Sequence, residues 1–186
     1  MRLLVGLLLL ALLAGCTATK DAVTTGNDFV FVSPGGRTEI FYDGADRKSI
    51  PDLSGESLMD EGKTLRISDY AGKVVVLNVW GAWCPPCRVE ASELQKIQDA
   101  GTQVLGIDVR DQQRSAPQDF VRDRKLTYPS IYDPPIKTLL ALKGYPRATV
   151  PSTIVLDRQH RVAAVYLRDL LATDLQPLLQ RLSAES

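Results

Sequence analysis

The chain contains few of the residues that bind metal ions, with one histidine and three cysteines among its 186 residues. Two of the cysteines, Cys84 and Cys87, are separated by two residues, and only His160 and Cys16 remain beside them. A structural zinc site needs four nitrogen or sulfur ligands. The scarcity of ligands therefore argues against a zinc site. From the sequence alone, the alternative that the cysteine pair supplies two of four zinc ligands stays open.

The chain also lacks net charge, because 22 lysines and arginines balance 22 aspartates and glutamates. Without a net field, nothing draws the protein over a distance to nucleic acid or to an acidic surface. We therefore expect no nucleic-acid partner and a substrate that is held by local contacts. The length is sufficient for one well-filled core and too short for two ordinary domains with linkers.

Long apolar runs are missing except at the N-terminus, where residues 3–13 follow Arg2. This run is short for a bilayer span and has the length of the hydrophobic region of a signal peptide. We predict a signal peptide over residues 1–15, followed over residues 16–28 by a polar, flexible tether. An uncleaved anchor and an ordinary signal peptide cut nearby are alternatives, and in each case the folded part lies outside the cytoplasm.

Residues 74–98 predict a strand, a sharp turn and a helix. Residues 74–79 are almost wholly apolar, as expected for a central strand that is covered on both faces. A helical pattern follows over about residues 85–98. Its inner face carries Cys87, Glu90, Leu94 and Ile97.

The cysteine pair lies where this helix begins, and the free N–H groups of a helix N-terminus favour a thiolate over a thiol. Cys84 precedes Pro85 and Pro86, which are tolerated in a first turn. Cys87 lies one turn on, so the pair can close a disulfide in which we expect Cys84 to be the more exposed and more acidic sulfur. This spacing predicts a redox motif. A purely structural disulfide is the alternative, although so small a loop constrains the unfolded chain little.

Residues 74–90, and above all Trp-Cys-Pro-Pro-Cys at residues 83–87, resemble the thioredoxin superfamily and, within it, the membrane-tethered TlpA/ResA/DsbE-like thiol–disulfide oxidoreductases. The resemblance extends over about residues 48–183. It implies a thioredoxin-like three-layer α/β fold with a central mixed sheet, in a domain over residues 29–186. It also implies thiol–disulfide exchange, in which Cys84 forms a mixed disulfide and Cys87 resolves it, with no cofactor besides this redox-active disulfide.

The remaining patterns complete the expected fold. Residues 29–32 and 39–42 flank a turn that contains proline and glycine, and they predict an N-terminal β-hairpin extension. With the elements above, the order of the core is β-α-β-α-β-β-α. The further expected strands cover residues 64–67, 103–108, 153–156 and 161–167, and the further helices cover residues 115–125, 133–144 and about 173–182.

Pro151 precedes the third core strand and matches the cis-proline that faces the cysteine pair in the resembled superfamily. The resemblance implies that Val150 then offers its backbone to a substrate chain by strand-like hydrogen bonds. Trp83, Pro85 and Pro86 are the other expected substrate-binding residues. For Pro151 a trans-proline at the start of a strand is the alternative, and for Trp83 plain core packing.

Glu90 lies on the inner helix face three residues after Cys87, a position where ResA-like proteins carry a glutamate. Thioredoxins have a buried aspartate six residues before the first cysteine, and this chain has Asn78 there. A partly buried Glu90 with a raised pKa is therefore the candidate proton shuttle for Cys87. The alternative is a surface salt bridge, the usual fate of a helical glutamate.

The sequence Leu-Ala-Gly-Cys at residues 13–16 resembles a bacterial lipobox. This implies that Cys16 is lipidated and anchors the protein to the extracytoplasmic face of the bacterial cell membrane. The implied partners are cysteine-containing secreted or membrane-attached proteins, apocytochrome c among them, and a membrane redox partner that recycles the disulfide. The implied processes are cytochrome c maturation or oxidative folding.

Three rival classes share this fold. A peroxiredoxin would carry threonine three residues before its reactive cysteine, where this chain has Gly81. A metal-delivery protein would need a C-x-x-x-C pair and a distal histidine, and neither the cysteine spacing nor the position of His160 agrees. A non-catalytic binding module that has kept the motif remains an alternative.

Overall fold

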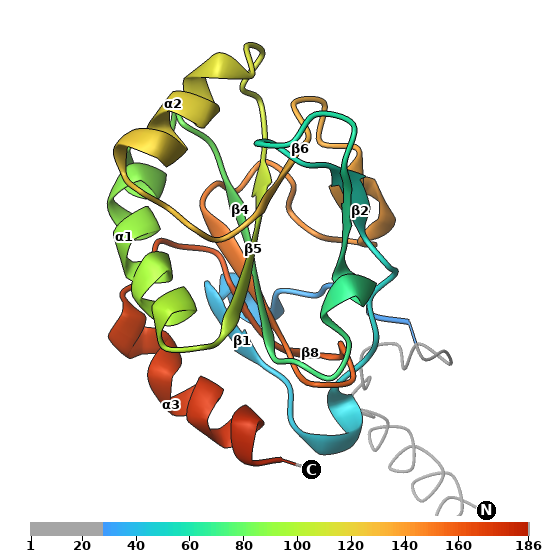
Figure 1. The fold of residues 1–186 in the computed structure, drawn as a ribbon. Coiled ribbons are helices and arrows are strands. Elements are labelled where there is room, and N and C mark those ends of the chain that lie inside the picture. Colours follow the sequence, from blue (N-terminus) through green and yellow to red (C-terminus); the bar gives the residue numbers. More distant parts are fainter. Residues whose placement is uncertain (1–27, 186) are drawn as a thin grey trace, which may run out of the picture.

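A six-stranded mixed sheet, in the order β1-β8-β7-β4-β5-β6, forms the centre of the computed structural model, which describes residues 28–185 (Figure 1). The central strand β4 is parallel to β5 on one side and antiparallel to β7 on the other. This is the mixed sheet that the resemblance to the thioredoxin superfamily implies. Its strands are β1 (Glu39–Phe41), β4 (Val75–Trp80), β5 (Gln103–Asp108), β6 (Ser130–Tyr132), β7 (Ser152–Leu156) and β8 (Val162–Tyr166).

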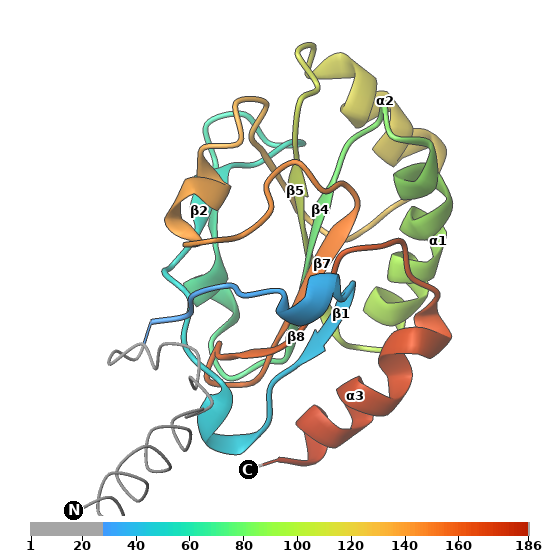
Figure 2. The same cartoon turned by 180° about the vertical axis from the view of Figure 1, so that it is seen from behind.

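The three α-helices lie together on one face of the sheet, as the two opposite views show (Figures 1 and 2). They are α1 (Pro85–Asp99), α2 (Ser115–Asp123) and α3 (Ala172–Ala184). The other face is covered by the N-terminal segment, a hairpin of β2 (Ser54–Glu56) and β3 (Thr64–Arg66), and the 3₁₀-helices η3 (Ile67–Tyr70) and η4 (Thr138–Ala141). None of the helices within residues 28–185 has the length and apolarity to cross a membrane.

Strand β4 separates two hydrophobic clusters, and all six of its residues are buried. Val75, Leu77 and Val79 belong to the cluster on the hairpin face. Val76 and Trp80 belong to the cluster on the helical face. The period-two alternation of a strand therefore directs Trp80, at the C-terminal end of β4, toward the helices.

The predicted hairpin of residues 29–32 with residues 39–42 is wrong. Strand β1 pairs antiparallel with β8, with Ile40 opposite Val165. The N–H of Phe31 donates instead to the carbonyl of Lys143, at 2.9 Å. Without β1, strand β8 would be the edge of the sheet, and its unpaired backbone groups bind β1. The hairpin in this region is formed instead by β2 and β3.

The helix predicted over residues 133–144 is reduced to the short η4. Ile136 has a positive φ of 61°, which interrupts a right-handed helix, and it follows two prolines. Leu140, expected inside, is 60% exposed. Asp133, expected as the N-cap, is not the N-cap of η4, which is Lys137, although the Asp133 carboxylate accepts the N–H groups of residues 137 and 138.

Strand β6 was not predicted, because three residues are too few for a periodic pattern. The helices expected over residues 115–125 and 173–182 are confirmed as α2 and α3 with small shifts of their ends. The predicted signal peptide, the lipidation site Cys16 and residues 17–27 of the predicted tether lie outside the described residues.

Candidate active site

The two cysteines lie at the N-terminus of α1, directly after β4, as the strand–turn–helix pattern predicts. Cys84 is the N-cap, with φ −92° and ψ 110°, and Pro85 and Pro86 occupy the first two helical positions. The N–H of Cys87 donates to Sγ of Cys84 at 3.3 Å, and the N–H of Arg88 donates to the carbonyl of Cys84 at 3.2 Å. Since prolines have no N–H, the sulfur at the N-cap is held by a single helical donor.

Cys84 and Cys87 form a disulfide with their Cα atoms 5.3 Å apart. Each cysteine is only 2% exposed, so the expectation that Cys84 is the more exposed of the two is wrong. The reason is packing, because both side chains belong to the hydrophobic cluster between the helices and the sheet. Exposure is found instead in the neighbours of Cys84, namely Pro85, Pro86 and Trp83, of which Trp83 is 45% exposed.

The active-site loop, residues 81–83, is held by the segment that follows β5. The N–H of Ala82 donates to Oδ2 of Asp111 at 2.7 Å, and Nε1 of Trp83 donates to the carbonyl of Val109 at 2.8 Å. The indole of Trp83 lies so close to Gly81 that a Cβ there would collide with it. At Gly81, where a peroxiredoxin would have threonine, there is therefore no room for a side chain unless Trp83 moves.

The two tryptophans beside the cysteines differ in their surroundings. Trp80 is 2% exposed, packs against Phe120 with ring centroids 5.7 Å apart, and donates from Nε1 to Oγ of Ser130 at 3.3 Å. It is part of the core. Of these two tryptophans, Trp83 is the one that presents an aromatic surface to a partner.

The peptide bond between Val150 and Pro151 is cis, as the resemblance implied. Ser152 pairs with Val79 across β7 and β4, which places Pro151 beside the end of β4, where the active-site loop begins. Val150 is half-buried and packs against the cluster that contains both cysteines. The hydroxyl of Ser152 accepts from Tyr145 at 2.8 Å and donates to the carbonyl of Thr149 at 2.9 Å, which fixes the segment before Pro151.

Glu90 is 1% exposed, so the alternative of a surface salt bridge is wrong. Its Oε2 accepts a hydrogen bond from Nδ2 of Asn78 at 3.1 Å, and its Oε1 accepts the N–H of Leu170 at 3.1 Å. Burial raises the pKa of Glu90 to about 8, although these two hydrogen bonds act in the opposite direction. The same amide nitrogen also donates to Oγ1 of Thr153 at 3.0 Å. The position where thioredoxins have an aspartate is therefore occupied by a neutral amide that donates two hydrogen bonds.

Sequence reasoning placed Glu90 inside the helix face but missed the groups that hold it, and it missed Asp111 as well. Leu170 contributes only a backbone N–H, which no sequence pattern marks. Asp111 had a weak signal, because it lies just after a buried parallel strand, at the sheet edge where the active-site loop also begins.

His160 lies in the turn between β7 and β8, where its Nε2 is 3.1 Å from the carbonyl oxygen of Tyr70. Within residues 28–185 no group of three or more histidine, cysteine, aspartate or glutamate side chains is placed to hold a metal ion. The zinc alternative therefore gains no further ligands from this part of the chain.

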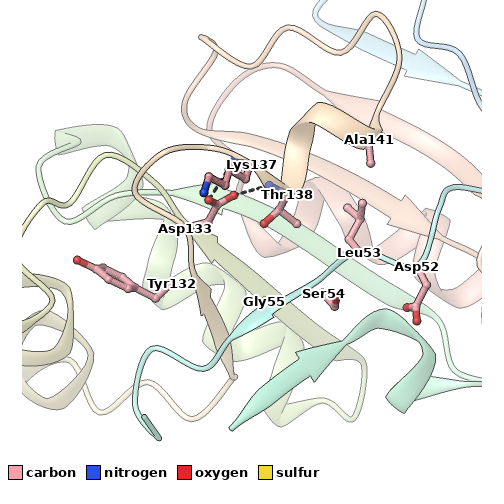
Figure 3. A pocket seen from close by; sticks show the side chains of 9 residues that line it. All are labelled: Asp52, Leu53, Ser54, Gly55, Tyr132, Asp133, Lys137, Thr138 and Ala141. Carbon is pink, nitrogen blue, oxygen red and sulfur yellow. Dashed lines mark hydrogen bonds between the residues drawn. The ribbon is translucent and has the colours of Figure 1, made fainter. Parts of the chain in front are cut away.

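A cavity of about 400 Å³ lies on the other face of the sheet, beside β2 and η4 (Figure 3). Neither cysteine lines it, and neither does Glu90 or Pro151. The cavity lining contacts the segment that holds the active-site loop through Tyr132, whose hydroxyl donates to the carbonyl of Asp111 at 2.8 Å. Its lining residues are Asp52, Leu53, Ser54, Gly55, Tyr132, Asp133, Lys137, Thr138 and Ala141.

Comparisons with known proteins agree with this geometry. The model of the AhpC/TSA family matches residues 47–165. The chain is 31% identical over 142 residues to the thiol:disulfide interchange protein DsbE of Pseudomonas aeruginosa, covering 74% of this chain and 77% of that protein. It is 28% identical over 124 residues to the thiol-disulfide oxidoreductase ResA of Geobacillus thermodenitrificans, covering 64% of this chain and 69% of ResA.

Two solved structures are similar over nearly their whole length. A secreted thiol-disulfide isomerase from Corynebacterium glutamicum superimposes with a TM-score of 0.82 and 50% identity, covering 84% of this chain and 98% of that one. A DsbF homologue from Corynebacterium diphtheriae gives a TM-score of 0.79 and 49% identity, covering 83% of this chain and 99% of that one.

Proposed function

The chain belongs to the AhpC/TSA family and is a thiol–disulfide oxidoreductase of the DsbE/ResA type, and from this premise we propose that it exchanges disulfides with extracytoplasmic proteins through Cys84 and Cys87. The observation that carries the proposal is the Cys84–Cys87 disulfide at the N-terminus of α1. Cys84 is the nucleophile because it is the N-cap, next to the exposed Trp83 and Pro85. Cys87 is the resolving cysteine because it lies on the inner helix face.

In the reducing direction, the Cys84 thiolate attacks one sulfur of a substrate disulfide. The substrate disulfide breaks, its other sulfur leaves and takes up a proton, and a mixed disulfide forms. The Cys87 thiolate then attacks Sγ of Cys84, which releases the second substrate thiolate, and this also takes up a proton. Two electrons and two protons pass to the substrate, and the enzyme is left with its own disulfide. The reverse sequence oxidises a substrate dithiol, and neither direction needs a further cofactor.

Glu90 is the proton carrier of this reaction. Cys87 must lose a proton before it attacks, and a raised pKa of about 8 brings the Glu90 carboxyl close to the ordinary pKa of a thiol. The two side chains are three residues apart on the buried face of α1. Asn78 and the N–H of Leu170 hold the carboxyl in place without giving it a cationic partner.

The substrate chain docks beside Val150 and Pro151, and Trp83, Pro85 and Pro86 form the apolar surface around it. This arrangement is supported by the position of Pro151 beside the end of β4 and by the exposure of the three loop and helix residues. Backbone hydrogen bonds give such docking affinity for unfolded segments of many sequences. The protein therefore acts on cysteines in unfolded or partly folded chains.

Residues 1–15 export the protein, and Cys16 carries the lipid that anchors it to the outer face of the cell membrane. There a membrane redox partner recycles the disulfide. The name of the secreted relative from Corynebacterium glutamicum supports an extracytoplasmic site. Mass spectrometry of Cys16 in the membrane fraction tests the lipid, and release of an unmodified Cys16→Ser protein into the medium would support the anchor.

Oxidative folding of secreted proteins is the first candidate process, because the two relatives that are about half identical are named a secreted isomerase and a DsbF homologue. Cytochrome c maturation is the second, with reduction of the haem-binding cysteines of apocytochrome c. It is supported by the resemblance to ResA/DsbE-like proteins. The equilibrium potential of the pair against glutathione separates the two, because an oxidase has a potential well above that of cytosolic thioredoxin and a reductase one close to it.

Covalent capture tests the exchange itself. A Cys87→Ser variant keeps the nucleophile and lacks the resolving thiol, so it should accumulate mixed disulfides with its substrates, which a reductant releases for identification. The matched control is Cys84→Ser, which should capture nothing. A non-catalytic binding module would show no turnover of a protein disulfide, and its partner would remain bound in Cys84→Ser.

A further inference from the structure

The end of β5 and the turn that follows it carry a buried carboxyl pair that the exchange mechanism does not use. Asp108, the last residue of β5, is 0% exposed, and neither of its carboxyl oxygens has a hydrogen-bond partner among residues 28–185. After burial, the largest influence that raises the pKa of Asp108 is the side chain of Asp111, which is itself only 7% exposed. Asp111 in turn accepts the N–H of Ala82, two residues before Cys84.

The sheet brings this pair to the active-site loop. Trp80, Asp108 and Tyr132 lie opposite one another at the C-terminal ends of β4, β5 and β6. Beyond Asp108 the chain turns at Arg110, which has a positive φ of 63°. The turn leaves Asp111 beside Asp108 and facing Ala82. The pair therefore connects the end of β5 to the loop that leads into the nucleophile.

Two carboxylates cannot bond to each other, because an ionised carboxylate only accepts hydrogen bonds. A protonated carboxyl has an O–H to donate, so one proton on Asp108 allows it to donate to Asp111. Burial is the first cause that raises the pKa of Asp108, to about 9, and the neighbouring Asp111 side chain and the charge of Asp133 raise it further. Near pH 7 this proton thus remains on Asp108.

Asp133, at the end of β6, adds negative charge beside the pair. Its N–H donates to the carbonyl of Asp108 at 2.8 Å. Its carboxylate oxygens accept the N–H groups of Lys137 and Thr138 at 2.9 and 2.7 Å, toward which they point in Figure 3. Asp133 is therefore satisfied as an anion, and its charge opposes ionisation of Asp108.

The cations near the pair are engaged elsewhere. Arg114 makes an ion pair with Glu56 at 2.8 Å, and its guanidinium lies over the ring of Tyr132. The guanidinium of Arg110 lies over the ring of Trp83, 5.7 Å from its centroid. Within residues 28–185 no ion pair reaches Asp108, so nothing there favours its charged form.

We propose that Asp108 is a positioning residue for the exchange reaction: as a neutral acid it donates to Asp111 and so keeps Asp111 as the acceptor that fixes the active-site loop through Ala82. The predicted effect on reaction rate rests on the proposed exchange at Cys84, whereas the effect on the position of the loop does not. Without the donor, the buried Asp111 carboxylate keeps one hydrogen bond instead of two and moves toward water. Ionised Asp108 has the same effect, because it places two negative charges side by side.

The protonation state is tested by infrared spectroscopy of the oxidised protein. Near pH 7, the difference spectrum of wild type minus Asp108→Asn should show the carbonyl stretch of a protonated carboxyl, and in the wild type this band should fade with a midpoint near pH 9. Glu90→Gln is the control, since it should remove a separate band that fades near pH 8. A difference spectrum without the protonated band would overturn the proposal.

The positioning is tested by amide hydrogen exchange at Ala82. Asp108→Ala should lower the protection of this N–H about tenfold, the value of roughly one hydrogen bond to a charged group. Asp108→Asn keeps a donor toward Asp111, so its protection of the Ala82 N–H should stay within about threefold of the wild-type value. The wild type should lose this protection above pH 9, whereas Asp108→Asn should keep it. The N–H of Ile154 in β7 reports global unfolding. Equal protection of Ala82 in Asp108→Ala and wild type, or equal losses at Ala82 and Ile154, would refute the positioning role.

The consequence for the reaction is measured as the rate at which the oxidised enzyme takes electrons from reduced, unfolded ribonuclease near pH 7. Asp108→Ala should react about tenfold more slowly, and Asp108→Asn should restore the rate to within about twofold. Equal rates in the two variants would contradict the proposal. If the wild type itself does not react, the oxidising direction of the proposed function fails, whereas the infrared and hydrogen-exchange results still decide the role of the acid pair.

Discussion

Replacing Glu90 by glutamine tests the protonation state on which its role as a proton carrier depends. Burial raises the pKa of the folded carboxyl to about 8, whereas the ordinary value, expected in the unfolded chain, is 4.5. Between these two pH values the folded protein holds a proton that the unfolded chain has released. Stability from this group is therefore complete below about pH 4.5 and falls as the pH rises to about 8.

The size of the effect follows from the two pKa values. At about 1.4 kcal/mol for each pKa unit, ionisation of Glu90 removes about 3 kcal/mol by pH 7, about 4 kcal/mol by pH 8 and about 5 kcal/mol by pH 9. Glutamine does not ionise and avoids this loss. Its amide has one oxygen for two donors, Asn78 and Leu170, and the unpaired donor costs about 1–3 kcal/mol. Glu90→Gln should thus be about 1–3 kcal/mol less stable near pH 4.5 and about 2–4 kcal/mol more stable near pH 9.

The assay is urea unfolding of the oxidised wild type and variant at a series of pH values, because the linear extrapolation gives the free energy of unfolding at each. Contributions from other titrating groups cancel in the difference between the two proteins. Asp99→Asn, which changes an exposed carboxyl at the end of the same helix, is the control variant. A difference between wild type and Glu90→Gln that stays constant from pH 4.5 to 9 would show that Glu90 is already charged when folded and would refute the reasoning.

Three further substitutions test the surroundings of the cysteines. Pro86→Ala restores an N–H at the start of α1, so it should lower the pKa of the Cys84 thiol by about one unit and raise the redox potential by about 30 mV. Thiolate absorbance measures the pKa and glutathione equilibria measure the potential. An unchanged thiol pKa would contradict the argument that a single helical N–H holds the Cys84 sulfur. Gly81→Ala should displace the Trp83 indole and cost about 1–3 kcal/mol, seen as a red shift of tryptophan emission and a lower unfolding midpoint, and unchanged emission would count against the steric argument. Trp83→Ala should change stability by less than about 1 kcal/mol but reduce capture of unfolded substrates by Cys87→Ser severalfold, and full capture would remove Trp83 from the docking surface.

Short segments were placed wrongly from the sequence because their partners lie far away along the chain. Residues 39–41 have the pattern of a strand, but the pattern does not say whether the partner is the preceding segment or β8. A helix was predicted over residues 133–144 because residues 136–140 have apolar positions at helical spacing. The two prolines before Ile136 already indicated that a helix would not form there. Three-residue strands such as β6 form because a neighbouring edge is available.

The sequence by itself determined the strand, the turn and the helix around the cysteines, the N-cap position of Cys84 and the inward direction of Glu90. These features depend on residues that are neighbours in the chain, so the periods of strand and helix and the lack of proline N–H groups are sufficient to define them. The cis bond at Pro151 followed from the resemblance, and the structure confirms it.

Only the tertiary structure decided how deeply the cysteines are buried and which groups hold the site. Leu170 is 80 residues from Glu90, and Asp111 is 29 residues from Ala82. The exposure of Cys84 and the environments of Glu90 and Asp108 depend on atoms brought together by the packing of the sheet against α1, α2 and α3. Burial and hydrogen bonding act through space, and the sequence order of the residues does not encode these distances.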